Sequence, residues 1–413
     1  MTVFHSKKKS DEEKDLEFRL GFGNIDDFDD DFDEDPGEEK PKSHRKRVIL
    51  IMAAIAIIIV GVGILWIYQL TYRSYSSYTE SSKSEPGVSG SSLAYEEFAD
   101  GYLQIAGGAL AYFNEGETIW ESALNMSRPI VDVCEGYAAA ADIGSTDVYI
   151  FDKSGEVGRF SVSHEIIDIE VSDNGMVALS TDYKDSSYIE IKDISGNDII
   201  NIKNNFSSTG YQQDIALSED GTMLAAAFLC VSDGTLRSKV FFYDLTAESS
   251  DDMLKASFDQ YQDTVLTDVE FLNNKTVCAM GDDRISFYRT DRDIQLINEE
   301  SSLDWEVQSV SFEKGRVLLI ARDGSSEYNY RAVVYNASGK RIADTGFDYS
   351  YSAARLAGRN ILLYSSYGFQ LINFRGHIRY TASTEARILS MKPISHKKYI
   401  LGTTAKVCFI RLQ

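Results

Sequence analysis

The sequence predicts an all-β protein, a β-propeller carried on one N-terminal transmembrane helix and preceded by an acidic tail. From about Tyr95 onward, short β-branched and aromatic runs alternate with Gly, Asn and Asp turns, which is typical of strands. No long stretch there has the 3.6-residue apolar period of a helix. The strand pattern also repeats, and an uncharged segment, Val48 to Leu70, precedes it.

The tail, residues 1–47, contains 15 acidic and 10 basic residues, with the densest acidic run at residues 26–35. Dense like charge with few aliphatic side chains does not bury enough apolar surface to offset chain entropy, so we expect disorder. Four cysteines and five prolines in 413 residues exclude disulfide-stapled and proline-rich classes of protein.

The uncharged segment, residues 48–70, is 23 residues long and would span about 34 Å as a helix, enough for a bilayer. It is too long and begins too late for a cleaved signal peptide. Basic residues lie mainly on its N-terminal side, and positive flanks stay cytoplasmic, so we expect a single-pass cell-membrane protein with its C-terminal domain outside. These basic residues are Lys40, Lys42, Arg45, Lys46 and Arg47. Residues 71–92, rich in Ser, are expected to be a linker to a domain at 93–413.

The repeat predicts a propeller because each unit holds about four short strands, the pattern of one blade. Aligning the first strands gives eight units whose starts are 36 to 54 residues apart. They begin near Tyr95, Asp132, Asp168, Asp214, Asp268, Ser309, Ser352 and Ser390. The last unit has room for two or three strands, so a segment before Tyr95 is expected to supply its outer strand. Because Gly87–Leu93 is a poor strand, eight blades are favoured and seven remain the alternative.

Two turns carry a resemblance to known repeats. Residues 218–225, Ser-Glu-Asp-Gly-Thr-Met-Leu-Ala, resemble the turn between the first two strands of WD40-like blades. Residues 114–120, ending in Trp120, look like the end of a quinoprotein-type repeat. The arrangement of tail, anchor and propeller is similar to an uncharacterised family of Gram-positive bacterial membrane proteins. That resemblance implies the architecture and an external propeller, and it implies no activity.

The candidate binding site is an arc of carboxylates on the first strands, which line the central channel of a propeller. The alignment places four acids at one equivalent position: Asp132, Asp168, Asp214 and Asp268. Such an arc could bind Ca²⁺, which prefers clustered oxygen ligands. The favoured interpretation is structural, because Asp and the Ser of later units both accept hydrogen bonds from neighbouring backbone N–H groups.

Other chemistry has little support in the sequence. His164, His377 and His396 belong to different units, and no closely spaced His, Cys or carboxylate set is typical of a zinc site. We therefore predict no catalytic residue, metal or cofactor. The four cysteines are interpreted as free buried thiols. Cys230 and Cys278 lie in comparable second strands of adjacent units, so they are the pair to test for a disulfide.

The favoured function is a membrane-anchored binding scaffold for an envelope protein or a wall glycan. The formal charge of −23 argues against a nucleic-acid partner, which would need phosphate neutralisation by Lys and Arg. The second hypothesis is a propeller hydrolase or lyase that uses the channel-mouth carboxylates, with or without a metal ion.

Overall fold

The computed structural model describes most of the chain from residue 42 onward. The described ranges are 42–84, 93–106, 108–114, 117–124, 126–232, 234–301, 306–313, 315–322 and 327–413. Residues 1–41, which hold nearly all of the predicted tail, and residues 85–92 of the predicted linker lie outside them. The chain divides into two units, Met1–Ile64 and Leu65–Gln413.

Helix α1 spans Lys42–Tyr72 and contains the whole predicted apolar segment. Within it, Val48–Trp66 has a mean hydropathy of 3.2 and none of its surface is buried in the protein. Apolar side chains cover every side of this stretch, so the helix has no polar face of the kind that a soluble surface helix needs. By length and composition, this one helix of the described chain is able to cross a membrane.

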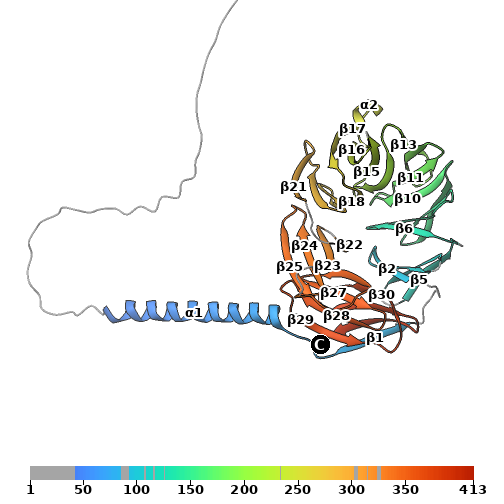
Figure 1. Cartoon of the computed structure of the whole chain (residues 1–413). Coiled ribbons are helices and arrows are strands. Elements are labelled where there is room, and N and C mark those ends of the chain that lie inside the picture. Colours follow the sequence, from blue (N-terminus) through green and yellow to red (C-terminus); the bar gives the residue numbers. More distant parts are fainter. Residues whose placement is uncertain are drawn as a thin grey trace, which may run out of the picture. The chain divides into compact units, whose positions relative to one another are not determined.

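The second unit is an eight-bladed propeller, which confirms the predicted fold (Figure 1). In the described residues, 32 strands form eight four-stranded antiparallel sheets. The colours in Figure 1 follow the chain once around the ring, so the first blade lies beside the last.

The strands of blades one to four follow the chain from inside to outside. Blade one contains β2 (Leu93–Phe98), β3 (Gly101–Ala106), β4 (Ala109–Asn114) and β5 (Glu117–Ala123). Blade two contains β6 (Pro129–Cys134), β7 (Tyr137–Asp142), β8 (Asp147–Asp152) and β9 (Gly155–Ser161). Blade three contains β10 (Glu165–Val171), β11 (Val177–Tyr183), β12 (Ser186–Lys192) and β13 (Asp198–Asn205). Blade four contains β14 (Tyr211–Leu217), β15 (Met223–Ser232), β16 (Thr235–Asp244) and β17 (Leu254–Gln262), with a short helix α2 (Ser250–Met253) before β17.

Blades five to seven repeat this order, and blade eight differs. Blade five contains β18 (Leu266–Asn273), β19 (Thr276–Gly281), β20 (Arg284–Arg289) and β21 (Gln295–Ser301). Blade six contains β22 (Val307–Glu313), β23 (Arg316–Arg322), β24 (Tyr330–Asn336) and β25 (Arg341–Phe347). Blade seven contains β26 (Ala353–Ala357), β27 (Asn360–Ser365), β28 (Gly368–Asn373) and β29 (Ile378–Ser383). Blade eight contains β30 (Ile388–Pro393), β31 (Lys398–Thr403), β32 (Val407–Leu412) and the N-terminal strand β1 (Tyr78–Ser84).

The hydrophobic core lies between neighbouring blades rather than within one sheet. Successive side chains of a strand point to opposite faces, so each second strand packs alternately on the blade before it and the blade after it. In β11, Val177 and Leu179 belong to the cluster shared with blade two, while Ala178 belongs to the cluster shared with blade four. Each blade therefore depends on both neighbours, and the ring must close to cover every face.

Ring closure comes from β1, which pairs antiparallel with β32 from Tyr78 opposite Leu412 to Ser84 opposite Val407. The missing outer strand thus precedes Tyr95, as expected, but it lies at 78–84 and not at Gly87–Leu93. Tyr78 packs against the cluster between blades seven and eight, and Glu80 forms an ion pair with Lys406. These side-chain contacts fix a polar Ser-rich segment as a strand, which composition alone does not indicate.

The chain between α1 and β1 is short and is bound to the propeller. Five residues separate Tyr72 from Tyr78. The amide of Tyr75 donates to the carbonyl of Arg379 at 2.7 Å, and that of Ser76 donates to the carbonyl of Gln413 at 2.9 Å. The Tyr75 ring is 6% exposed and belongs to the core cluster of blades seven and eight. Residues 73–84 are therefore part of the folded domain and not a free linker.

Cys134, Cys230 and Cys278 are free thiols, and Cys230 and Cys278 do not pair. Cys230 lies near the C-terminal end of β15, opposite Arg237, whereas Cys278 lies near the beginning of β19. The two second strands are equivalent, but the two residues lie at different depths along them.

Replacing Tyr75 with Ala should destabilise the propeller by about 3–5 kcal/mol, because the truncation leaves a cavity where β1 enters the last blade. Chemical denaturation of the full chain would measure the change. The control is Tyr367→Ala in blade seven, where the side chain is 58% exposed. Equal effects of the two substitutions would contradict the proposed role of Tyr75.

In the native protein, Cys278 should resist alkylation, because it is buried and burial raises the pKa of its thiol well above the usual value. Mass spectrometry after iodoacetamide treatment should show Cys278 modified only in denaturant, without any reductant. A requirement for reductant would reveal a disulfide and overturn the free-thiol assignment.

Candidate functional site

One mouth of the central channel holds a cavity of about 480 Å³, built from innermost strands and the turns that follow them. Its walls are rich in carboxylates, and Lys392 is the one basic residue among the described residues that line it. The carboxylates are Glu96, Glu97, Asp132, Glu135, Glu170, Glu219, Glu270 and Glu313.

Three of the four predicted acids occupy one equivalent position. Asp168, Asp214 and Asp268 each follow directly after a β-bulge, and they pair with Ser180, Ala227 and Met280 of the second strands. Ser309 and Ser390 hold the same place after bulges in β22 and β30. A bulge bends the strand and re-aims the side chain that follows it. This ring of short acceptors lies deeper in the channel than the cavity lining.

Asp132 does not belong to that ring. Its predicted equivalence to Asp168, Asp214 and Asp268 is wrong by two residues. Val133 pairs with Ala138 as Val171 pairs with Val177, which places Asp132 level with Glu170. The error arose because β6 has no bulge and is joined to β7 by a two-residue turn, whereas five residues join β10 to β11. Ser352 is likewise displaced by one residue, since it precedes β26 and Ala353 occupies the ring position.

The aspartates connect neighbouring innermost strands, which share no ladder with one another. Asp132 Oδ2 accepts a hydrogen bond from the Val171 amide at 2.7 Å, and Asp214 Oδ2 accepts one from the Val269 amide at 2.7 Å. Asp168 accepts from the Ile215 amide in the same way. These contacts have the geometry expected of the structural interpretation, in which a short acceptor satisfies a neighbouring backbone N–H.

A second ring, nearer the mouth, places glutamates on the channel wall. Cross-strand register puts Glu96, Asp132, Glu170 and Glu270 at one level on blades one, two, three and five. On blades seven and eight the same level is occupied by Arg355 and Lys392. Both bases contact Glu96, at 3.2 Å from the Arg355 guanidinium and 2.5 Å from Lys392 Nζ. The mouth is therefore acidic on one side and ion-paired on the other.

Glu170 and Glu270 were missed from the sequence, and both lie on the acidic side without a hydrogen bond or ion pair to the described residues. The signal that could have found them is the repeated Asp-x-Glu of residues 168–170 and 268–270. In a strand, side chains two residues apart point to the same face, so both acids of each pair face the channel.

Burial and crowding hold several of these carboxyls partly protonated at neutral pH. Burial is the main cause in each case, and neighbouring carboxylates add to it. The pKa of Asp132 is raised to about 6, that of Glu270 to about 8 and that of Asp214 to about 9. The pKa of Glu170 is raised well above its usual value, with Asp132 the foremost of its charged neighbours. The acidic side thus lacks the cations that would keep its carboxyls ionised.

No three His, Cys, Asp or Glu side chains converge as ligands for a metal ion anywhere in the described ranges. The carboxylates of the arc are instead distributed around the channel wall: Asp132, Asp168 and Asp214 accept from backbone amides, and Asp268 accepts from Thr267 Oγ1. The three histidines also lie apart: His164 beside Glu190 in blade three, His377 between β28 and β29, and His396 between β30 and β31.

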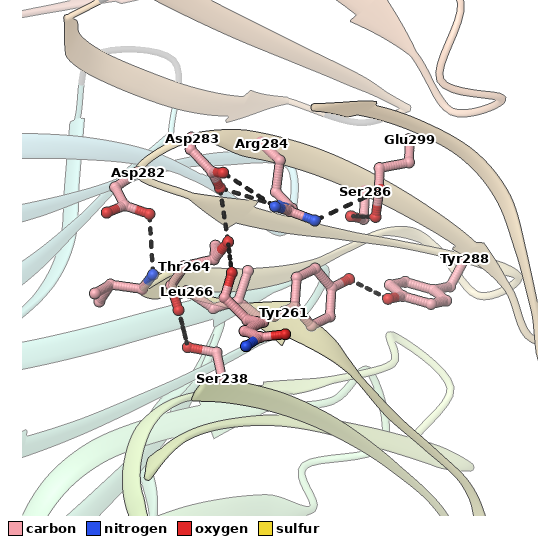
Figure 2. Close-up of polar contacts among 12 residues, drawn as sticks. Ser238, Tyr261, Thr264, Leu266, Asp282, Asp283, Arg284, Ser286, Tyr288 and Glu299 are labelled. Carbon is pink, nitrogen blue, oxygen red and sulfur yellow. Dashed lines mark hydrogen bonds and ion pairs between the residues drawn. The ribbon is translucent and has the colours of Figure 1, made fainter. Parts of the chain in front are cut away.

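A second polar cluster, at the crossover from blade four to blade five, is fully paired and structural (Figure 2). Asp283 accepts hydrogen bonds from Thr264 Oγ1 at 2.8 Å and from Arg284 Nε at 2.9 Å. Ser238 Oγ donates to the Thr264 carbonyl and accepts from the Leu266 amide. Arg284 keeps the pKa of Asp283 below its usual value. Because these groups satisfy one another, the cluster fixes the crossover and leaves nothing to bind a ligand.

Because the pKa values of the channel carboxyls are raised, we expect the propeller to lose stability as pH rises. Their folded-state pKa values lie above the value of about 4 in an unfolded chain, so the folded state binds more protons between about pH 4 and pH 9. This contribution to stability is therefore fully present below about pH 4 and is lost as the pH rises through the folded-state pKa values of about 6 to 9.

Glu270→Gln should raise the melting temperature at pH 9 by a few degrees, which corresponds to a gain of roughly 1–3 kcal/mol in the free energy of unfolding. At pH 5 the melting temperature should be unchanged. Glu165→Gln, at an exposed position on β10, is the matched control. Calorimetry at both pH values would measure the effect. A lower melting temperature of Glu270→Gln at pH 9 would mean that the fold stabilises the ionised carboxylate, contrary to this assignment.

Several solved structures share this architecture at low sequence identity. Sqt1 of Saccharomyces cerevisiae is 10% identical, with 83% of this chain and 100% of that chain covered and a TM-score of 0.51. Sqt1 of Chaetomium thermophilum is also 10% identical, with 82% and 100% covered and a TM-score of 0.51. BamB of Moraxella catarrhalis is 12% identical, with 81% and 100% covered and a TM-score of 0.47. The two Sqt1 structures show the propeller fold alone.

No curated protein matches the chain in sequence. A family model matches over residues 71–412, a range that begins before β1 and ends within one residue of the C-terminus. The chain therefore belongs to the family of unknown function DUF5711.

Proposed function

We propose that this protein is a membrane-anchored binding scaffold whose channel mouth accepts a basic segment of an envelope protein. The observation that carries the proposal is the pair Glu170 and Glu270, two carboxyls that face the cavity with no cationic partner among the described residues. A Lys or Arg side chain in the cavity would supply that partner and keep both carboxyls ionised.

The size of the cavity sets the kind of partner. A volume of about 480 Å³ lies in the range of sites that hold a small ligand or a few side chains, and is far too small for a folded domain. Glu170 and Glu270 would bind the basic group together with Asp132, while Asp168 and Asp214 would keep the innermost strands in register. Because the carboxyls hold protons before binding, a cation should release protons as it binds.

The location of the partner follows from the anchor. Helix α1 would hold the propeller beside a membrane, and the basic N-terminal flank favours a cytoplasmic tail and a propeller outside. An envelope protein with a Lys- or Arg-rich segment would then meet the channel mouth. A neutral glycan of the cell wall carries no positive charge that could pair with the carboxyls of the channel. The protein partner is therefore favoured over the glycan.

A hydrolase or lyase is the second candidate, and the raised pKa of Asp132, about 6, is the observation in its favour. A carboxyl that titrates near neutral pH is suited to general acid catalysis. Release of products from wall material by the purified full chain, lost in Asp132→Asn, would favour this enzyme over the scaffold.

Binding of a synthetic hexalysine peptide to the full chain in nanodiscs tests the scaffold. The double variant Glu170→Gln/Glu270→Gln should weaken binding at least tenfold, because it removes both unpaired carboxyls. The control Glu121→Gln/Glu165→Gln removes two exposed acids of the propeller and should leave the affinity unchanged. Calorimetry in buffers of different ionisation enthalpy would also measure the protons released. Equal affinity of the two double variants would show that the peptide binds elsewhere, and would overturn the proposal.

A further inference from the structure

The charge of the propeller is divided between its blades. Residues 353–413, which form blade seven and the C-terminal strands of blade eight, contain ten Lys or Arg and one acid, Glu385. Residues 71–352 contain 21 Lys or Arg and 48 Asp or Glu. A strongly acidic domain therefore carries one basic sector, and this sector is where the chain arrives from helix α1.

Four of the five exposed bases of that sector gather at one end of the two sheets, and the fifth, Arg387, lies at the opposite end. Arg359 lies in the turn from β26 to β27, and Arg375 lies in the turn from β28 to β29. Lys398 and Arg411 face each other on β31 and β32; Lys398 is the first residue of β31, and Arg411 lies one residue before the end of β32. These turns and strand ends all lie at the same end of an antiparallel blade, and the carbonyl of Arg359 accepts a hydrogen bond from the amide of Phe374 at 3.3 Å.

The same end receives the chain from the membrane helix. Tyr78 pairs with Leu412, so β1 begins at the end of β32 and Arg73 precedes it at this face. We call Arg73, Arg359, Arg375, Lys398 and Arg411 the basic face; all five are exposed. Arg359, Arg375, Lys398 and Arg411 form no ion pair with the residues that the structure describes. Glu385 lies at the opposite end of the blade, in the connection from β29 to β30.

The length of the connection brings this face close to the bilayer. Helix α1 ends at Tyr72, and Tyr75 is already hydrogen-bonded to blade seven through the Arg379 carbonyl. The two residues between them span roughly 10 Å at most. The Debye length at physiological salt is about 8 Å, so charges at this distance still act on a charged surface.

We propose that the basic face binds the anionic phosphate headgroups of the lipid leaflet on the propeller's side. Basic residues next to a membrane helix are attracted to anionic lipids. The acidic blades would be repelled by the same surface, so the propeller meets the bilayer through blades seven and eight. The inference depends on the basic face and the short connection, and not on any ligand of the channel.

Hydrogen exchange of the full chain in nanodiscs tests the proposal. The turns at 357–360 and 373–378 should exchange several-fold more slowly in nanodiscs with 30% phosphatidylglycerol than in nanodiscs of phosphatidylcholine alone. The protection should disappear in 0.5 M NaCl, since screening weakens headgroup contacts. Equal exchange in the two lipid compositions would overturn the proposal.

Matched variants distinguish the effect of the basic face from a general effect of positive charge on the propeller. Arg359→Gln/Arg375→Gln/Lys398→Gln should lose the lipid-dependent protection. Lys153→Gln/Lys275→Gln/Lys340→Gln removes the same charge from exposed turns of blades two, five and six at the corresponding sheet end, and should retain it. Loss in both variants, or retention in both, would contradict the assignment to these residues.

One further experiment distinguishes binding of the basic face to lipid from its binding to a soluble polyanion. Poly(glycerol phosphate) added to phosphatidylcholine nanodiscs carries the same phosphate chemistry without a bilayer. If this polymer protects the turns and phosphatidylglycerol does not, the basic face recognises a polymer and the lipid proposal is wrong. Thermal melting of both triple variants checks that each is folded, so that lost protection reports lost contact.

Discussion

Ring closure is the constraint on which the rest of the structure depends. Every blade buries its faces against two neighbours, so a gap between the first and last blades would expose the core cluster that they share. The C-terminal segment supplies three strands of blade eight, and β1 supplies the fourth. The residues that follow helix α1 are therefore structural parts of the propeller.

The second organising feature is the separation of charge within the propeller. Blades two to five line the channel with carboxyls, whereas blades seven and eight carry the bases. Glu96 of blade one lies at the boundary and contacts both Arg355 and Lys392. The electrostatic energy of bringing so many acids together is reduced by protonation on one side and by ion pairs on the other. This arrangement explains how an acidic domain tolerates a carboxyl-rich channel.

The fold was largely predictable because its signals are local. Tight turns need Gly at positive φ. The φ angles of four turn glycines lie between 69° and 82°: Gly175, Gly196, Gly221 and Gly339. Strand periodicity between such turns gives the unit length and thus the blade count. The site was less predictable, because β-bulges and turn lengths shift the register without changing the spacing of residues in the chain. The spacing of residues in the chain therefore equates Asp132 with Asp168, although Asp132 lies level with Glu170.

The sequence by itself determined the strand repeat, the apolar helix and the overall acidity, because each of these depends on composition and periodicity over neighbouring residues. Only the tertiary structure decided that 78–84 is a strand, since its partner, β32, lies more than 320 positions away in the chain. The same holds for the convergence of Glu170 and Glu270 on one cavity, and for the gathering of Arg73, Arg359 and Lys398 at one end of two blades. Contacts between distant segments have no signature in local pattern, because the closure of the ring creates them.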